Sequence, residues 1–383
     1  AAEWLVARPE EERDEYLGTI GHHYAEAQAP VQAAEWYLQA GERARETYAL
    51  ETAIGFYRQA LDLLPDQREM AELRIQLCEG LGLALSHQAY YTEAEAVFEE
   101  MFQLAQQIGD RLAQVRALNG VHYVTEKQGR HRAALTKTQQ ATKLARALNA
   151  PAQLAYALVN QGFAYFRLGE LEQALQAAEQ ALPLNEEHGS ASQIVANCNL
   201  LGGIHDFMGD YEKSTYYQER ALELCRKEKE RWGLVRALNN LGENARLRGD
   251  YQAATEFFQE ALTHAREVGD RDLETMILCG LGGAQAGLGE YVVAEETLLQ
   301  AIEMSKNENE QLAQAFSHLF LSEARLGQHN LRTAHEAAHD ALELGETTGL
   351  SAVTGGTWRV FGELAAARAG TVRVREETLT AEA

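Results

Sequence analysis

The most constraining feature of this 383-residue sequence is one column of residues, mostly glycine, that returns every 40 positions. The column reads Ala89, Gly129, Gly169, Gly209, Gly249, Gly289 and His329. A period of this length, kept without a gap through seven repeats, is typical of a solenoid in which each repeat packs against its neighbours. The repeat therefore takes precedence over the two or three independent domains that the chain length alone would suggest.

Each repeat is predicted to contain two helices and two kinds of joint. Small residues such as Ala254 and Ala261 are seven apart, which places them on one helix face and lets a neighbouring helix approach closely. The glycine column predicts a tight turn with positive φ between the two helices. A second column predicts left-handed helix C-caps at Gly109, Asn149, Gly189, Lys229, Gly269, Asn309 and Gly349. No stretch alternates as a strand would, so the sequence predicts an all-α fold.

The order of residues within a repeat resembles a known family. One copy reads Leu238-x-x-Leu241-Gly242, Gly249, Tyr251, Ala254 and Ala261, and a last helix carries Trp358-x-x-Phe361-Gly362. This order resembles the tetratricopeptide repeat (TPR), which implies a right-handed α-solenoid of helix-turn-helix repeats. The copies run 40 residues instead of the usual 34 and lack the final proline. In this they resemble the longer-helix form found in kinesin light chain and related peptide binders.

The domain organisation follows from the register of the repeat. We expect seven 40-residue repeats over 67–350, a closing helix over 351–370 and a disordered tail over 371–383. Residues 1–66 are helical but out of register, and their run Ala33-Ala34-Glu35-Trp36-Tyr37 resembles the segment that follows the ATPase core in bacterial STAND-type signalling ATPases. That resemblance implies an upstream ATPase domain, although the chain contains no G-x-x-x-x-G-K-[ST] motif. We therefore expect this sequence to be part of a longer protein.

Charge and cysteine usage exclude several classes of protein. The formal net charge of −23 disfavours nucleic acid and anionic membrane surfaces, which bind clustered positive charge. The uncharged stretch 189–205 is too polar to span a membrane. Cys78, Cys198, Cys225 and Cys279 are far apart and form no C-x-x-C pair, so we expect buried, reduced thiols and a cytoplasmic location.

One motif in the sequence matches a known catalytic metal site. His335-Glu336-Ala337-Ala338-His339 reads H-E-x-x-H on a predicted helix, a spacing that can hold Zn²⁺ with the glutamate as general base. However, the other repeats place varied residues at these positions, and no third ligand follows at a known spacing. We therefore predict no catalytic residue, no metal and no cofactor. A zinc hydrolase through His335 and His339 remains an alternative.

A binding groove is the stronger candidate. In TPR arrays the first helix of each pair lines the concave face, where amides recur at Asn119, Asn199 and Asn239. Exposed aromatic residues in a concavity are common contacts for a partner. The predicted groove consists of Arg116, Asn119, Tyr123, Tyr156, Asn160, Phe163, Asn199, Arg236, Asn239, Asn240 and Glu243. We expect the amides to be solvated in the absence of a ligand. Alternatively, they bridge adjacent helices while the aromatic side chains fill gaps between repeats.

These observations predict a protein that binds rather than catalyses. The two resemblances imply the sensor or scaffold arm of a STAND-like signal-transduction ATPase, with that ATPase in cis. The ligand expected in the groove is a protein, a peptide or a small molecule, with no nucleic acid and no membrane as partner. A free-standing TPR adaptor that binds peptides is the alternative.

Overall fold

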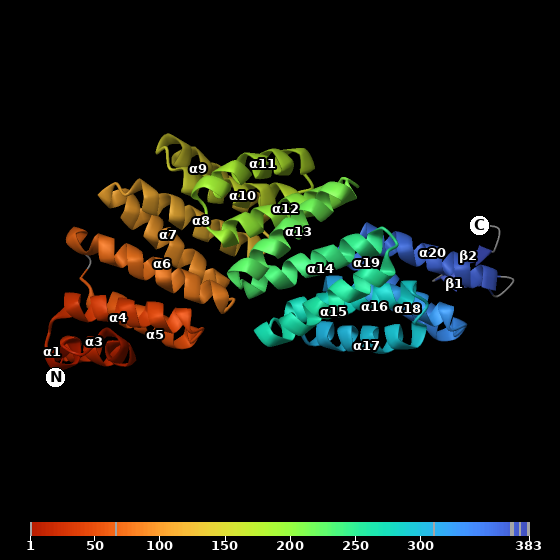
Figure 1. Cartoon of the computed structure of the whole chain (residues 1–383), viewed down its shortest axis with the longest axis horizontal. Coiled ribbons are helices and arrows are strands. Elements are labelled where there is room, and N and C mark those ends of the chain that lie inside the picture. Colours follow the sequence, from red (N-terminus) through yellow and green to blue (C-terminus); the bar gives the residue numbers. More distant parts are fainter. Residues whose placement is uncertain (1, 66, 309–310, 368–370, 375–376, 381–383) are drawn as a thin grey trace. The chain divides into compact units, whose positions relative to one another are not determined.

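The structure, a computed structural model, describes residues 2–65, 67–308, 311–367, 371–374 and 377–380, and these are almost entirely helical (Figure 1). The chain forms two compact units, residues 1–190 (unit 1) and 191–383 (unit 2). In both, consecutive helices pack in antiparallel pairs at the predicted 40-residue period. The all-α solenoid expected from the sequence is thereby confirmed.

Unit 1 begins with short helices and continues into the repeats. Its elements are α1 (Ala2–Val6), α2 (Glu10–Arg13), the 3-10 turn η1 (Asp14–Tyr16), α3 (Leu17–Glu26), α4 (Pro30–Glu46), α5 (Leu50–Leu63), η2 (Arg68–Met70), α6 (Ala71–His87), α7 (Tyr91–Ile108), α8 (Arg111–Lys127), α9 (His131–Ala147), α10 (Pro151–Arg167) and α11 (Leu171–His188). Its core includes the fully buried Tyr57 and Phe98, with small residues between them.

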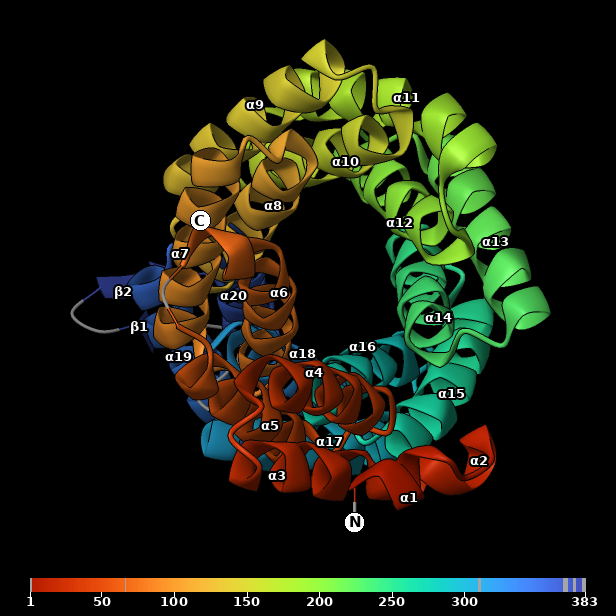
Figure 2. The same ribbon diagram turned by 90° about the vertical axis from the view of Figure 1, so that its left-hand side faces the viewer.

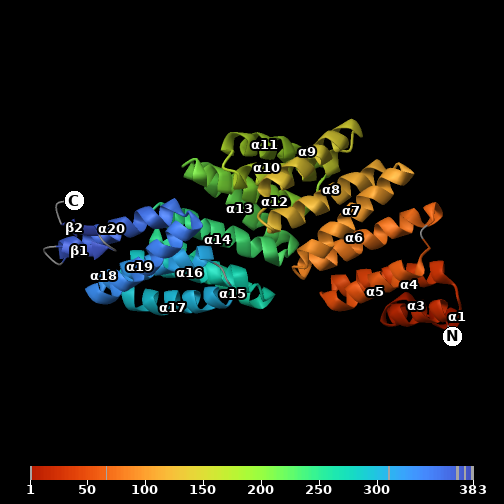
Figure 3. The same ribbon diagram turned by 180° about the vertical axis from the view of Figure 1, so that it is seen from behind.

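Unit 2 continues the same pattern. Its elements are α12 (Ala191–Phe207), α13 (Tyr211–Glu228), α14 (Arg231–Leu247), α15 (Tyr251–Val268), α16 (Arg271–Gly287), α17 (Tyr291–Glu308), α18 (Gln311–Gly327), α19 (Leu331–Thr348), α20 (Ser351–Ala367), β1 (Thr371–Val374) and β2 (Glu377–Thr380). Figure 3 shows α20 and the two strands at the C-terminal end of this unit.

The expected disorder of the tail over 371–383 is wrong for the part that the structure describes. Strands β1 and β2 form an antiparallel hairpin with Thr371 opposite Thr380 and Val374 opposite Glu377, and the hairpin contacts α20. Threonine and valine favour extended backbone, so local β-propensity prevails over the polar character of the tail. Residues 375–376 and 381–383 of the tail lie outside the described residues.

The turns between paired helices follow the predicted column. All seven of its residues have positive φ, including the two that are not glycine, Ala89 at 60° and His329 at 59°. At Gly249, with φ of 79°, the amide donates to Arg246 O at 3.0 Å, and the next amide donates to Ala245 O at 2.9 Å. These bonds satisfy carbonyls that the end of α14 leaves without a helical partner.

The second joint follows its prediction at five positions and departs from it at one. Positive φ occurs at Gly109, Asn149, Lys229, Gly269 and Gly349, whereas Asn309 lies outside the described residues. The prediction for Gly189 is wrong, because its φ is −92°. Its amide still donates to Asn185 O, and a Cβ at this position would lie 2.7 Å from that oxygen. Glycine is needed here for close approach and not for a left-handed turn.

The first helix of each repeat lies on the inner side of its unit. In unit 1, α6 contacts α8 and α8 contacts α10; in unit 2, α14 contacts α16 and α16 contacts α18. The second helices α7, α9 and α11 make no comparable contacts with one another in the described part of unit 1. Figure 2 shows the same order in each unit taken separately. The inner helices are thus the ones on which the sequence places the groove.

All four cysteines are buried and unbridged, as expected. Burial raises the pKa of the thiols of Cys78, Cys225 and Cys279 to about 12. Because the thiolate is the reactive form, these side chains act as core residues.

Candidate functional site

Four of the predicted groove residues of unit 1 form a hydrogen-bonded amide pair and a pair of exposed tyrosines. Asn119 on α8 is only 5% exposed, and its Oδ1 accepts a hydrogen bond from Asn160 Nδ2 of α10 at 3.3 Å. Tyr123 and Tyr156 are each 40% exposed. The expectation that the Asn119 amide is solvated is therefore wrong, since this amide bridges adjacent inner helices.

The remaining predicted residues of unit 1 are held by neighbours. The guanidinium of Arg116 forms an ion pair with Glu79 of α6 at 3.0 Å, and Phe163 is half-buried. Lys127 lies 5.8 Å from the centre of the Tyr123 ring, within the range of a cation–π contact. The inner face of unit 1 therefore offers two exposed tyrosines beside fixed charges.

In unit 2 the predicted amides also lie in different environments. Asn239 is 7% exposed, and Asn240 donates to Gln218 Oε1 at 3.3 Å. Asn199 is half-buried, and its Oδ1 is buried with no hydrogen-bond partner among the described residues. Arg236 is exposed. The expected solvation of the amides is thus wrong for Asn239 as well.

Arg246 of α14 is the centre of the most developed site on these inner helices. Its guanidinium lies 4.9 Å from the centre of the Phe320 ring of α18, and its Nη2 donates to Glu243 Oε2 at 2.8 Å. Two cavities of about 330 and 180 Å³ lie beside it, and Arg246 and Phe320 line both. A charged group is thereby held at the edge of two empty spaces.

The two cavities differ in character. The smaller one is lined by Asn239 and Glu243 together with the half-exposed apolar side chains of Met276, Leu312 and Phe316. The larger one is lined by Glu323, Arg359 and Glu363, and by small residues of α16, Gly283, Ala286 and Gly287. The site therefore combines an apolar pocket with a charged one.

The charges of the site are balanced by close pairing. Burial opposes the charged form of Arg246, but the carboxylate of Glu243 outweighs this effect and raises the Arg246 pKa above its usual value. Burial also raises the pKa of Glu323, while its ion pair with Arg359 works in the opposite direction. Arg359 also forms a second ion pair, in which its Nη1 lies 2.6 Å from Glu363 Oε1. A ligand that replaces one of these partners would meet a preformed charge.

The H-E-x-x-H motif lies elsewhere in unit 2. The rings of His335 and His339 are 4.6 Å apart, and their centres lie 5.6 and 5.2 Å from that of the buried Phe361. Glu336 forms an ion pair with Arg332 at 2.9 Å. No group of three or more His, Cys, Asp or Glu suited to a metal occurs among the described residues. The two histidines therefore belong to an aromatic cluster.

Sequence comparison agrees with this architecture. The family described as tetratricopeptide repeat matches residues 153–227, 192–267 and 233–307. The chain contains a TPR domain. No curated protein matches the sequence. Among the residues that the structure describes, no helix is both long enough and apolar enough to cross a bilayer.

Solved structures resemble the TPR domain at low identity. A Rap protein complexed with competence and sporulation factor has 15% identity and a TM-score of 0.59, covering 88% of this chain and 100% of its own. The apo form of RapI has 13% identity and a TM-score of 0.54, covering 78% and 99%. A STAND protein with a tetratricopeptide repeat sensor from Pyrococcus horikoshii has 14% identity and a TM-score of 0.55, covering 92% and 56%. These likenesses are likenesses of fold.

Several residues of the Arg246 site were missed by sequence reasoning, which included only Asn239 and Glu243 of its lining. Phe316 lies two repeats after the predicted groove residue Arg236, Glu323 lies two repeats after Glu243, and Arg359 lies three repeats after Asn239. The signal that could have found them is chemical: in unit 2 these columns carry arginine, glutamate and phenylalanine in consecutive inner helices of the TPR domain.

Proposed function

We propose that this TPR domain is a non-catalytic binding arm that takes a segment of a partner protein, or a peptide, on its inner helices. The observation that carries this proposal is Arg246, held by Glu243 and Phe320 beside two cavities. Arginine in a partly desolvated site is a strong donor to carboxylates and carbonyls. The apolar pocket by Met276 and Phe316 suits an apolar side chain next to that polar group.

The inner face of unit 1 is proposed as a second contact area. Tyr123 and Tyr156 keep exposed ring surface, and aromatic residues of this kind are frequent hot spots at interfaces. In this proposal the buried Asn119 positions the helices and the two tyrosines contact the partner. The exposed Arg236 contacts the partner on the inner helices of unit 2. The other predicted groove residues line the same inner helices.

The binding arm is further proposed to be the sensor of a STAND-like signalling ATPase in the cytoplasm. Support comes from the fold shared with the sensor-bearing protein of Pyrococcus horikoshii and from four buried, unbridged thiols. The full-length protein provides the test. A P-loop upstream of residue 1, and ATP hydrolysis that changes when a selected peptide is added, are expected. A full-length chain without a P-loop would identify a free-standing adaptor instead.

The binding proposal is tested by selecting peptides from a random display library against the purified domain. Selected peptides are then titrated by fluorescence polarisation against wild type, Arg246→Gln and Arg248→Gln. Arg248 is an exposed control two residues away in the sequence. We expect Kd to rise about tenfold or more in Arg246→Gln, the loss of a charge-assisted hydrogen bond, and to stay within about twofold in the control. Failure to enrich peptides, or equal binding by both variants, would overturn the proposal.

The alternative of a zinc hydrolase is tested separately. Because His335 and His339 pack on Phe361 and Glu336 pairs with Arg332, we expect less than stoichiometric zinc after dialysis against the metal. Tight zinc that is lost in His339→Ala would support the alternative.

A further inference from the structure

The charge of the chain is distributed unevenly in unit 1. Although the net charge is −23, residues 127–169 contain no aspartate or glutamate. The same 43 residues contain seven cations: Lys127, Arg130, Arg132, Lys137, Lys143, Arg146 and Arg167. This stretch includes the whole of α9, an outer helix, and α10, the inner helix that follows it. An acidic protein therefore has one locally basic region.

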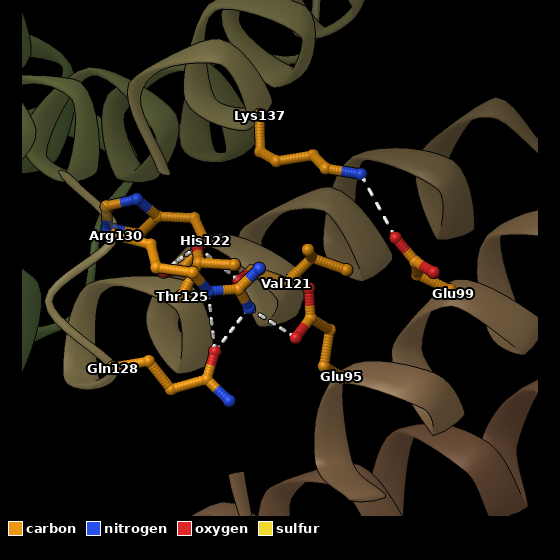
Figure 4. A network of polar contacts seen from close by, with 8 residues as sticks. All are labelled: Glu95, Glu99, Val121, His122, Thr125, Gln128, Arg130 and Lys137. Carbon is orange, nitrogen blue, oxygen red and sulfur yellow. Dashed lines mark hydrogen bonds and ion pairs between the residues drawn. The ribbon is translucent and has the colours of Figure 1, made fainter. Parts of the chain in front are cut away.

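One side of α9 is neutralised by the preceding outer helix. Arg130, at the start of α9, pairs with Glu95 of α7, and Lys137 pairs with Glu99 at 3.3 Å. Figure 4 shows both ion pairs crossing from α9 to α7, with Gln128 also bound to Arg130. The cations on this side are structural, because each has a carboxylate partner within the unit.

The other side of α9 is not neutralised. Lys143 and Arg146 are exposed, and the structure gives neither of them a carboxylate within ion-pairing distance among the described residues. Both line a groove of about 620 Å³ between α9 and α11, with Leu158, Gln161 and Tyr165 of α10 at its floor. The rest of its polar lining is rich in amides: Gln139, Gln173, Gln176 and Gln180.

Comparison with equivalent positions in other repeats shows that this groove lacks carboxylates found elsewhere. Residues 80 positions later, two repeats on, occupy equivalent places in the α13–α15 pair of unit 2. There Arg226, the equivalent of Arg146, forms an ion pair at 2.7 Å with Glu260, the equivalent of Gln180. Likewise, Glu99 and Lys137 correspond to Gln139 and Ala177 one repeat later. In the α9–α11 groove, amides therefore occupy the places of the carboxylates that pair with cations at the α7–α9 and α13–α15 interfaces.

We propose that the α9–α11 groove is a second binding site, which takes an acidic peptide segment on the outer face of unit 1. Carboxylates of the segment would pair with Lys143 and Arg146, in the place that Glu260 takes beside Arg226. Glutamine amides both donate and accept hydrogen bonds, so they match the backbone of an extended peptide. The groove volume lies in the range of roughly 300–1,000 Å³ that is usual for ligand sites, which fits a segment of a few residues.

The test uses fluorescein-labelled hexaglutamate as the probe and labelled hexaglutamine as its uncharged counterpart. Both are titrated into the purified chain at low ionic strength, followed by fluorescence polarisation. We expect hexaglutamate to bind and hexaglutamine to bind at least about tenfold more weakly, because the charge pairs are lost. Absence of hexaglutamate binding, or equal binding of the two probes, would overturn the proposal.

Three variants locate the probe. The double variant Lys143→Ala/Arg146→Ala and the single variant Gln180→Glu should each raise the hexaglutamate Kd, the first by about tenfold or more. Gln180→Glu keeps the size of the side chain and copies Glu260. It therefore places a carboxylate of the protein beside Arg146 without endangering the fold. The matched control is Arg132→Ala, an exposed cation of α9 that does not line the groove.

The control variant separates a site from general electrostatic attraction. Arg132→Ala should leave the Kd within about twofold, since only long-range charge is altered. Equal weakening by Arg132→Ala and by the double variant would overturn the proposal. So would full displacement of the probe by inorganic phosphate at a concentration equal to that of hexaglutamate carboxylates, because a simple anion site would then explain the binding.

Discussion

Arg246 reaches Phe320 across an intervening helix. The two residues belong to α14 and α18, which are separated by α16, and the guanidinium still lies 4.9 Å from the ring centre. Gly283 of α16 makes this contact possible, since a Cβ at that position would lie 2.9 Å from the Phe320 ring. The absence of a side chain on the middle helix thus lets three successive repeats contribute to one site.

Gly283→Val should disturb this contact and destabilise the protein. The added side chain would force Phe320, which is buried, out of its present position, and overpacking of this kind costs typically 1–3 kcal/mol. Urea denaturation followed by circular dichroism measures the change. Gly362→Val is the matched control, because a Cβ at Gly362 meets nothing within 4 Å. Equal stability of the two variants would contradict the proposed role of Gly283.

The turn column allows a test of backbone conformation alone. Gly249 has φ of 79° and no atom within 4 Å of an added Cβ, so Gly249→Ala should lower the free energy of unfolding by about 1–2 kcal/mol through backbone strain. Gly355 of α20 is equally unobstructed but helical, and Gly355→Ala should raise stability by about 0.5–1 kcal/mol. Opposite signs for the same chemical change are the expected result of thermal or urea unfolding. A gain in stability from Gly249→Ala would show that the turn tolerates a side chain freely.

These turns show why the fold was predictable from the sequence. Ala89 and His329 are poor choices for positive φ, yet both adopt it, because their place in the 40-residue register matters more than their type. A column repeated seven times averages out such exceptions. Gly189 departs from its column, and an added Cβ there would lie close to the backbone of Asn185, a contact that a column cannot reveal.

The candidate site was less predictable, for a related reason. Columns identify equivalent positions, but burial depends on the neighbouring repeats, so Asn119 is buried while the equivalent Asn199 is half-buried. The contact between Arg246 and Phe320 joins helices two repeats apart and depends on Gly283 between them. No single column contains that information.

The amide pair Asn119–Asn160 in unit 1 should be energetically coupled. Asn160 Nδ2 donates to Asn119 Oδ1, so removing either side chain leaves the other without this partner. Asn160→Ala should cost about 1–3 kcal/mol of stability, since the unpaired Asn119 amide stays buried, and a double-mutant cycle with Asn119→Ala should give a coupling of about 0.5–1.5 kcal/mol. Additive effects in urea denaturation would mean that the bridge contributes nothing.

A buried histidine should make the stability of unit 1 depend on pH. Burial lowers the pKa of His122 to about 4, although Glu126 and a hydrogen bond to the backbone of Ala134 partly counteract this effect. In the unfolded chain an imidazole titrates near 6.5. Between these two values the unfolded chain binds a proton that the folded chain excludes, so the free energy of unfolding should fall as pH is lowered from about 6.5 to 4. Above about pH 6.5 the stabilisation is complete, and below pH 4 this group adds no further loss.

His122→Ser isolates this contribution, because serine occupies the same column at Ser322 and is buried there. The difference in unfolding free energy between wild type and variant should change by up to about 3 kcal/mol between pH 6.5 and 4, as a pKa shift of this size implies. Urea denaturation at several pH values measures that difference, and the comparison with the variant cancels the titration of the carboxylates common to both proteins. Parallel pH dependences would show that His122 takes up its proton in the folded protein as readily as in the unfolded chain. In that event, the interior of unit 1 around α8 would have to admit water to a side chain that the structure places at 4% exposure.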